Sequence, residues 1–340
     1  MSTTETIKKE GAEAGAKTET TYLEAIRQAL FEEMERDERV IILGEDIGFY
    51  GGAFGVSLGL MEKFGPERVL ETPIAETGFT GAACGAAMMG FRPVVEFQFL
   101  DFISTAFDMI TNFAATSRYR TGMGIPMVVR GPCGGGVRGG PFHSQNPEAF
   151  FFNTPGLKIV APSTAYDAKG LLKAAIRDDD PVIFLEHKFL YRRVKEVLPA
   201  EEFVVPIGKG IVRRTGDDLT LITYGGMMSR SIEAAEMLEK EGISVEVIDM
   251  RSILPFDMDL ILESVKKTSK AMIVHEATLT GGAGGEFAAR ITEHAFEYLD
   301  GPVLRVASQD TPVPYSPPLE DFFMPNTDII ANAARKLAAY

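Results

Sequence analysis

The sequence predicts an α/β protein with two consecutive domains, each built on a mainly parallel sheet. Short β-branched runs alternate with helical stretches along most of the chain, which is typical of parallel strands covered by helices. A charged, proline-containing stretch around 191–199 interrupts this alternation, and 340 residues are enough for two separate cores. We therefore expect a disordered tail at 1–20, a first domain at 21–190, a linker at 191–207 and a second domain at 208–340.

The elements follow in chain order. The tail at 1–20 mixes Lys with Glu and contains no Arg, so it does not look like a targeting peptide. In the first domain, strands are expected at 39–43, 68–72, 93–97, 126–130, 157–160 and 181–185. In the second domain, strands are expected at 219–223, 245–248, 271–274 and 303–306, with helices near 229–240, 258–267, 285–298 and 327–337.

Composition excludes several classes of protein. The formal net charge is −14, whereas nucleic acids and anionic membranes attract clustered Lys and Arg, so we expect neither partner. No apolar run approaches the ~20 residues that span a bilayer. The two cysteines, Cys84 and Cys133, cannot form a disulfide framework and lie in no metal-ligand spacing, which favours a reducing cytoplasm.

The run from Pro73 to Gly81 places one carboxylate, Glu76, where a strand hands over to a helix. Ligands bind at this edge in α/β proteins. The helix that follows, 81–90, has little side-chain volume, so another element can pack against its backbone and exclude water. We expect Glu76 to be desolvated, with a raised pKa, and to share a proton with the basic ring nitrogen of a ligand.

This run resembles the pyrimidine-binding half of thiamine diphosphate enzymes. It is most similar to the beta subunit of the decarboxylating component of 2-oxo acid dehydrogenase complexes, from about Tyr22 to the C-terminus. The resemblance implies a thiamine-type pyrimidine-binding domain followed by a transketolase-like C-terminal domain. It also implies oxidative decarboxylation of a 2-oxo acid on thiamine diphosphate, with Glu76 as a catalytic residue.

The resemblance assigns further cofactor contacts, which are Glu45, Ile74, Ala75, Gln98 and Phe102. Glu45 follows an apolar strand, so it shares the edge of Glu76, although such an acidic residue is more often a turn or capping feature. Gln98 and Phe102 would flank the aminopyrimidine, where an aromatic face can stack on the ring; aromatic spacing alone would indicate only core. Many relatives carry Tyr at the position of Phe102, so a phenolic hydrogen bond is absent here.

A glycine-rich stretch, 130–145, leads to His143. Gly134, Gly136 and Gly139 match the spacing of a dinucleotide-binding loop, but no acidic residue ends the next strand, at 157–160. We favour a flexible loop that brings an imidazole to the substrate, and we interpret His187, His275 and His294 as structural. The resemblance implies that His143 orients the 2-oxo acid and assists acyl transfer to a lipoyl group.

The chain contains no Gly-Asp-Gly motif, with which thiamine enzymes anchor the diphosphate and its Mg2+. Half of the cofactor site must then come from elsewhere. The resemblance implies that an alpha subunit contributes this other half of the cofactor site. It also implies a heterotetramer of two alpha and two beta chains that passes its product to a lipoyl acyltransferase core.

Two points stay open. A K+ site is known in relatives around the match to Ala175, Ile176, Asp178 and Asp180, but this acidic cluster is as easily a solvated helix end. Substrate signals conflict, since the strings at 118–122 and 143–151 look like branched-chain members and those at 311–315 and 319–321 look like pyruvate or acetoin members. A nucleotide-binding oxidoreductase and a non-catalytic assembly subunit remain as alternatives.

Overall fold

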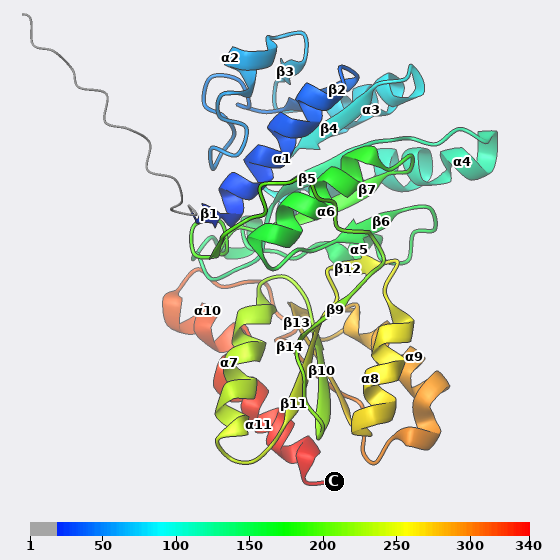
Figure 1. Ribbon diagram of the computed structural model, residues 1–340. Helices are drawn as coiled ribbons and strands as arrows, with labels where there is room; N and C mark the ends of the chain where they lie inside the picture. The colour runs from blue at the N-terminus through cyan, green and yellow to red at the C-terminus, as the bar shows by residue number, and fades with distance from the viewer. Residues whose placement is uncertain (1–18) are drawn as a thin grey trace, which may run out of the picture.

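The computed structural model describes residues 19–340, which form two large sheets stacked end to end with helices on their faces, and one small two-stranded sheet (Figure 1). The first part of the chain builds the upper sheet in this view and the last part builds the lower one. Of the tail predicted at 1–20, residues 1–18 lie outside the described part. Thr20 already pairs in the two-stranded sheet of β1 (Thr20–Thr21) and β8 (Lys195–Glu196).

The upper sheet has seven strands in the order β12-β6-β7-β5-β4-β2-β3. Six of them run parallel, as the alternating pattern predicts, and their carboxyl ends therefore meet at one edge. These six are β2 (Val40–Gly44), β3 (Val69–Glu71), β4 (Arg92–Glu96), β5 (Val128–Cys133), β6 (Lys158–Val160) and β7 (Val182–His187).

Both faces of this sheet are buried, because successive side chains of a strand point to opposite faces. In β2, Val40 and Ile42 join the core under helices α1 (Tyr22–Arg36) and α6 (Ala165–Arg177), while Ile41 and Leu43 join the core on the other face. Helix α3 (Glu76–Met88) and the short 3-10 helix η1 (Leu100–Ala106) cover that second face. Because both faces are buried, a strand such as β2 is apolar along its whole length.

The lower sheet has the order β14-β13-β10-β11-β9. Helices α7 (Met227–Glu239) and α11 (Thr327–Ala338) cover one face, and α8 (Met258–Thr268) and α9 (Gly284–Ala295) cover the other (Figure 1). Its strands are β9 (Ile211–Arg214), β10 (Leu219–Thr223), β11 (Val245–Asp249), β13 (Ala271–Thr278) and β14 (Leu304–Ser308), of which only β9 is antiparallel.

One strand crosses between the two halves, which the sequence analysis does not predict. Strand β12 (Ser252–Leu254) follows β11 in the chain yet pairs antiparallel with β6 of the upper sheet. Next to it, Arg251 Nη1 contacts Asp167 Oδ1 at 3.1 Å, and Arg213 bridges Asp167 and Asp249. A buried ion cluster and a shared strand therefore join the halves. A run of three residues is too short to signal a strand by its pattern.

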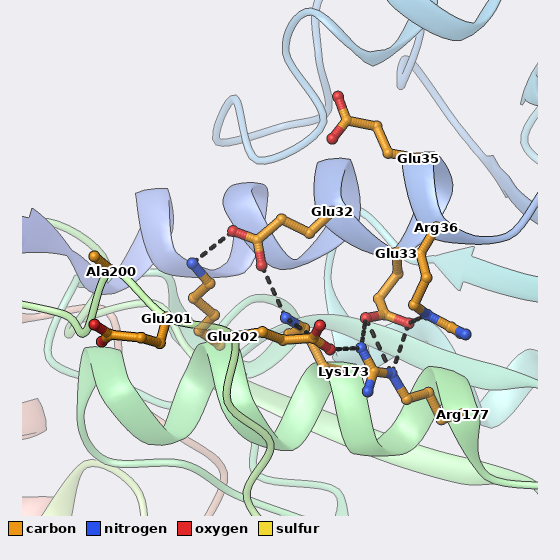
Figure 2. Close-up of a pocket in the computed structure, with 10 residues that line it drawn as sticks. Glu32, Glu33, Glu35, Arg36, Lys173, Arg177, Ala200, Glu201 and Glu202 are labelled. Atoms are coloured by element: carbon orange, nitrogen blue, oxygen red, sulfur yellow. Dashed lines mark hydrogen bonds and ion pairs between the residues drawn. The ribbon is translucent and has the colours of Figure 1, made fainter.

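Opposite charges join α1 to α6 around a polar cavity of about 360 Å³ (Figure 2). Lys173, whose side chain is only 2% exposed, lies 2.9 Å from Glu32, and Arg177 Nη2 lies 2.6 Å from Glu33 Oε1. Glu202 approaches from the connecting segment and contacts Arg177. The charges lining this cavity largely neutralise one another, so we assign it to the packing of the two helices.

Within 19–340, no helix is both long and apolar enough to cross a membrane.

Candidate active site

The carboxyl edge of the upper sheet gathers the predicted cofactor residues, because neighbouring parallel strands end there. Glu45 follows β2, Glu76 begins α3 after β3, and Gln98 and Phe102 follow β4. The glycine loop that carries His143 leaves β5, the next strand of the same sheet. Residues that are far apart in the chain are thus brought to one place by the strand order alone.

Glu45 is a buried carboxyl at this edge, and burial raises its pKa. Its side chain is buried, and its Oε1 has no hydrogen-bond partner among the described residues. Burial, followed by the negative charges of Glu76 and Asp46, raises the pKa of Glu45 from 4.5 to about 7. The group can therefore hold or release a proton near neutral pH.

Glu76 is half-buried at the first turn of α3, beside Ala75 and the strongly exposed Ile74. The desolvation expected for Glu76 is found instead at Glu45 in this chain. The small residues of α3 do allow close packing on one side, where Cys84 and Ala83 are buried, but Gly85 faces open space. The exposed side of this helix start leaves Glu76 accessible to a ligand.

Gln98 and Phe102 both follow β4 at this edge. Gln98 donates from Nε2 to Asp46 Oδ2 at 2.6 Å, and Asp46 takes a positive φ of 55° to reach it. Phe102 is half-buried, and its ring centre lies 5.8 Å from that of His143 in a T-shaped contact. Asp46 therefore orients Gln98, and Phe102 links the cofactor residues to the glycine loop.

The glycine loop carries His143 back against aromatic side chains of the η1 region. The His143 ring makes a T-shaped contact with Phe99 at 4.4 Å between ring centres. Of the three glycines in the loop spacing, Gly134 and Gly136 have a positive φ of 81°, whereas Gly139 has a φ of −79°. Gly139 leads into a three-residue 3-10 helix, Gly140–Phe142, whereas a dinucleotide fingerprint opens a long α-helix for the pyrophosphate.

Asp101 is a site residue that the sequence reasoning missed. Its buried Oδ1 accepts hydrogen bonds from the backbone N–H groups of Ser144 at 3.0 Å and Gln145 at 2.9 Å. Burial raises the pKa of this carboxyl against the opposing effect of these bonds. Asp101 thereby fixes the residues directly after His143. A single acidic residue within an aromatic segment was the available signal.

A buried ion cluster supports the ends of β4, β5 and β7. Arg130 is fully buried and forms ion pairs with Glu96 and with Glu186, which also accepts from the Tyr191 hydroxyl at 2.7 Å. Burial opposes the charge of Arg130, but the two carboxylates outweigh it and raise its pKa. This cluster fixes the relative positions of three strands directly below the site.

The residues of the expected cation site, Ala175, Ile176, Asp178 and Asp180, surround the C-terminal end of α6. Cationic side chains already contact several of their oxygens. Arg92 donates to the carbonyls of Ile176 at 3.0 Å and Asp178 at 2.9 Å, while Lys158 Nζ lies 2.6 Å from Asp178 Oδ2. Arg118 pairs with Asp180 at 2.6 Å. The structure thus gives these acceptors protein partners of their own.

The residues at the carboxyl edge fit one half of thiamine diphosphate. A buried carboxyl with a free oxygen, an amide and a half-buried aromatic ring suit a flat, basic ring with an exocyclic amine. Within residues 19–340, no group of three His, Cys, Asp or Glu side chains is arranged to hold a metal ion.

Comparison with known proteins identifies relatives of both halves. The model of the transketolase pyrimidine-binding domain matches residues 18–194, and that of the transketolase C-terminal domain matches residues 208–330. The 2-oxoisovalerate dehydrogenase subunit beta of Bacillus subtilis is 51% identical over 94% of this chain and 99% of its own length. The pyruvate dehydrogenase E1 component subunit beta of Rhizobium meliloti is 47% identical over 93% of this chain and 69% of its own.

Solved structures agree with the fold. A split-gene transketolase, described as an inactive beta4 tetramer, superimposes with a TM-score of 0.78 at 25% identity, over 94% of this chain and 98% of its own. A transketolase variant from Pichia stipitis superimposes with a TM-score of 0.67 at 16% identity, over 94% of this chain and 46% of its own, which shows a common fold.

Proposed function

Because this chain belongs to the family of beta subunits of thiamine-dependent 2-oxo acid dehydrogenases, we propose specific roles for the residues at its carboxyl edge. Family membership makes the chain one component of an enzyme that works with an alpha subunit and implies thiamine diphosphate as cofactor. The observation that carries the residue assignment is the convergence of Glu45, Glu76, Gln98 and Phe102 at one edge of the upper sheet.

Bound thiamine diphosphate supplies the carbon nucleophile and the electron sink for decarboxylation. The half-buried Glu76 carboxyl would share a proton with the pyrimidine ring nitrogen. Glu45, whose pKa is raised to about 7, would lie near the same ring and balance the charge of Glu76 by keeping its own proton. Phe102 would contact the ring, and so would Ile74 and Ala75, which directly precede α3.

His143 orients the 2-oxo acid and moves a proton during acyl transfer to the lipoyl group. Its place supports this role, since the ring lies against Phe99 and Phe102 at the same edge. The backbone after it is fixed by Asp101. We assign this imidazole the role of general acid or base.

The substrate is a 2-oxo acid, either branched-chain or pyruvate, and the beta-subunit relatives of both kinds fit this choice. Acetoin is the alternative acyl donor. The chain works in a heterotetramer of two alpha and two beta chains, and a lipoyl acyltransferase core accepts the product. Its two cysteines are buried and free, which suits a reducing cytoplasm.

The same proposal assigns the metals and the functional units. Mg2+ is held mainly by the alpha subunit, which carries the diphosphate motif that this chain lacks. We propose K+ as a ligand at the C-terminal end of α6. Its binding there requires Arg92 or Lys158 to break a contact with one of the oxygen atoms that would hold the ion. We propose 21–190 as the pyrimidine-binding unit and 208–340 as the C-terminal unit, with 191–207 between them.

Calorimetric titration of thiamine diphosphate and Mg2+ tests the half-site. The chain alone should fold, self-associate and bind the cofactor weakly, without decarboxylase activity. Addition of an alpha subunit carrying Gly-Asp-Gly should raise cofactor affinity and create activity together, because one interface completes the site. Tight, Mg2+-dependent binding by the chain alone would overturn the proposal.

A further inference from the structure

A carboxylate of the lower sheet contacts the glycine loop, which belongs to the first half of the chain. Glu276, on β13, is buried, and its Oε1 accepts from the Gly135 backbone N–H at 2.6 Å and from Asn146 Nδ2 at 2.9 Å. Its Oε2 lies 2.8 Å from His187 Nε2. One side chain therefore contacts the loop before His143 and the segment after it.

A second carboxylate acts beside the first. Glu320, on helix α10 (Pro317–Phe323), is fully buried and accepts from the Gly136 backbone N–H at 3.0 Å. Its other oxygen accepts from Arg138 Nη1 at 2.6 Å, and Arg138 adopts a positive φ of 63°. The first half of the glycine loop is thus fastened to the second half of the chain.

The glycines permit this close approach. A Cβ at Gly135 would lie 2.7 Å from Met324 Sδ and 3.3 Å from Glu320 Oε1, and one at Gly136 would lie 2.9 Å from the Phe189 ring. Any larger residue would push the backbone away from the two carboxylates. The loop is glycine-rich here because its N–H groups must reach acceptors on another element.

The surroundings of Glu276 favour its ionised form. Burial alone would raise its pKa, but the His187 ring, the Gly135 N–H and the Asn146 amide outweigh burial and lower it to about 2. Hydrogen bonds to a buried carboxylate are stronger than those between neutral groups. Glu276 is therefore well suited to fix a segment that would otherwise move.

We propose that Glu276 is a positioning residue, through which the C-terminal half of the chain sets the place of His143. It holds the loop at Gly135 and Asn146, while Asp101 holds it at Ser144 and Gln145. Its effect on the reaction passes through the His143 side chain and therefore rests on the role proposed for that residue. Two readouts separate the two ideas, one of loop motion and one of catalysis.

Hydrogen exchange of the loop amides, measured in the assembled alpha–beta enzyme, reports on motion. Glu276→Ala should speed exchange over residues 134–143 by at least about tenfold, since opening the loop no longer breaks charge-assisted bonds. Glu276→Gln keeps an oxygen toward Gly135 and should restore exchange to within about threefold of the original chain. Arg138→Ala, a milder change at the rim, should speed exchange by a few-fold near Gly136.

The matched control is Glu246→Ala. Glu246 is a buried carboxylate on β11 of the same sheet, and it pairs with Ser264 and Lys267, away from the loop. This variant destabilises the lower sheet without touching Gly135 or Asn146. Loop exchange in it should stay unchanged, so a change common to both variants would contradict a specific role for Glu276.

Kinetics of lipoyl acylation provide the second readout. Glu276→Ala should lower kcat by about 10- to 100-fold, as expected for a misplaced catalytic group, and leave the affinity for thiamine diphosphate nearly unchanged. In a His143→Ala background the same change should cost little more, because both act through one group. Additive losses, or unchanged loop exchange in Glu276→Ala, would overturn the inference. Full activity of His143→Ala would instead refute the role of His143, and the exchange data would then decide alone whether Glu276 holds the loop.

Discussion

The buried Glu45 carboxyl lies within electrostatic reach of the Glu76 carboxylate, and the two cannot both ionise without cost. Burial contributes most to raising the pKa of Glu45 to about 7, and the charge of Glu76 adds to it. Two carboxyls in one site are a common device for keeping one proton available. The pair therefore gives the chain a measurable response to pH even without its partner.

Replacement of Glu45 should change how stability depends on pH. The folded state holds the Glu45 proton up to about pH 7, whereas an unfolded chain loses it near 4.5. Stability from this group is thus present below pH 4.5 and lost as pH rises through 7, by roughly 3 kcal/mol in full. Urea unfolding of the chain alone should show Glu45→Gln more stable than the original at pH 8 and equal to it at pH 4.5. The same difference at both pH values would contradict the assignment.

Glu76→Gln should preserve folding and assembly, but the glutamine side chain cannot exchange a proton with the pyrimidine ring as the carboxyl does. Turnover of the alpha–beta enzyme should fall by about 10²- to 10⁴-fold. The pKa of Glu45 should also fall, because its charged neighbour is gone. Steady-state kinetics measure the first effect, and the pH dependence of unfolding measures the second. Near-normal turnover would remove Glu76 from the mechanism.

His143→Ala should impair acyl transfer more than decarboxylation. With an artificial electron acceptor, which bypasses the lipoyl group, the loss should be smaller than with lipoyl domain as acceptor, by about tenfold or more. Phe142→Ala, next to it in the loop and exposed, serves as a control for loop disturbance. Equal losses in both assays would point to substrate binding instead.

Removal of the buried cation Arg130 should be strongly destabilising. Arg130→Met leaves Glu96 and Glu186 as buried charges without a counter-ion, which costs about 3–5 kcal/mol at pH 8. The loss should shrink as pH falls and the carboxyls take up protons. Denaturant titrations of this variant, with and without Glu96→Gln and Glu186→Gln, check it. No relief from the added changes would mean that packing dominates.

Much of the fold follows from local patterns. The strand Val40–Gly44 is a continuous apolar run and Arg92–Glu96 has an apolar centre, and their parallel pairing brings the segments after them, which carry Glu45 and Gln98, to the same edge. The same patterns could not predict which carboxyl is buried. Whether Glu45 or Glu76 loses contact with water depends on how segments far away in the chain pack around them, and this packing leaves no periodic signal in the sequence.

Contacts between the two halves of the chain could not be predicted from the sequence either. Glu276 and Gly135 are separated by 141 positions, and nothing near either residue identifies the other as its partner. The sequence predicts that these glycines allow close approach to a substrate, but it does not show that Gly135 and Gly136 lie close to carboxylates of the second half of the chain. His187, for which the sequence predicts a structural role, contacts the same Glu276 carboxylate.

Strand β12 makes the two halves inseparable as building blocks. A fragment ending at the connecting segment would leave the edge of β6 bare, with unpaired N–H and C=O groups that invite association with other chains. The complementary fragment would carry Ser252–Leu254 without a sheet to join. Expression of the two family domains as separate fragments should therefore give pieces that aggregate and fold poorly, and folding should recover when both are produced together.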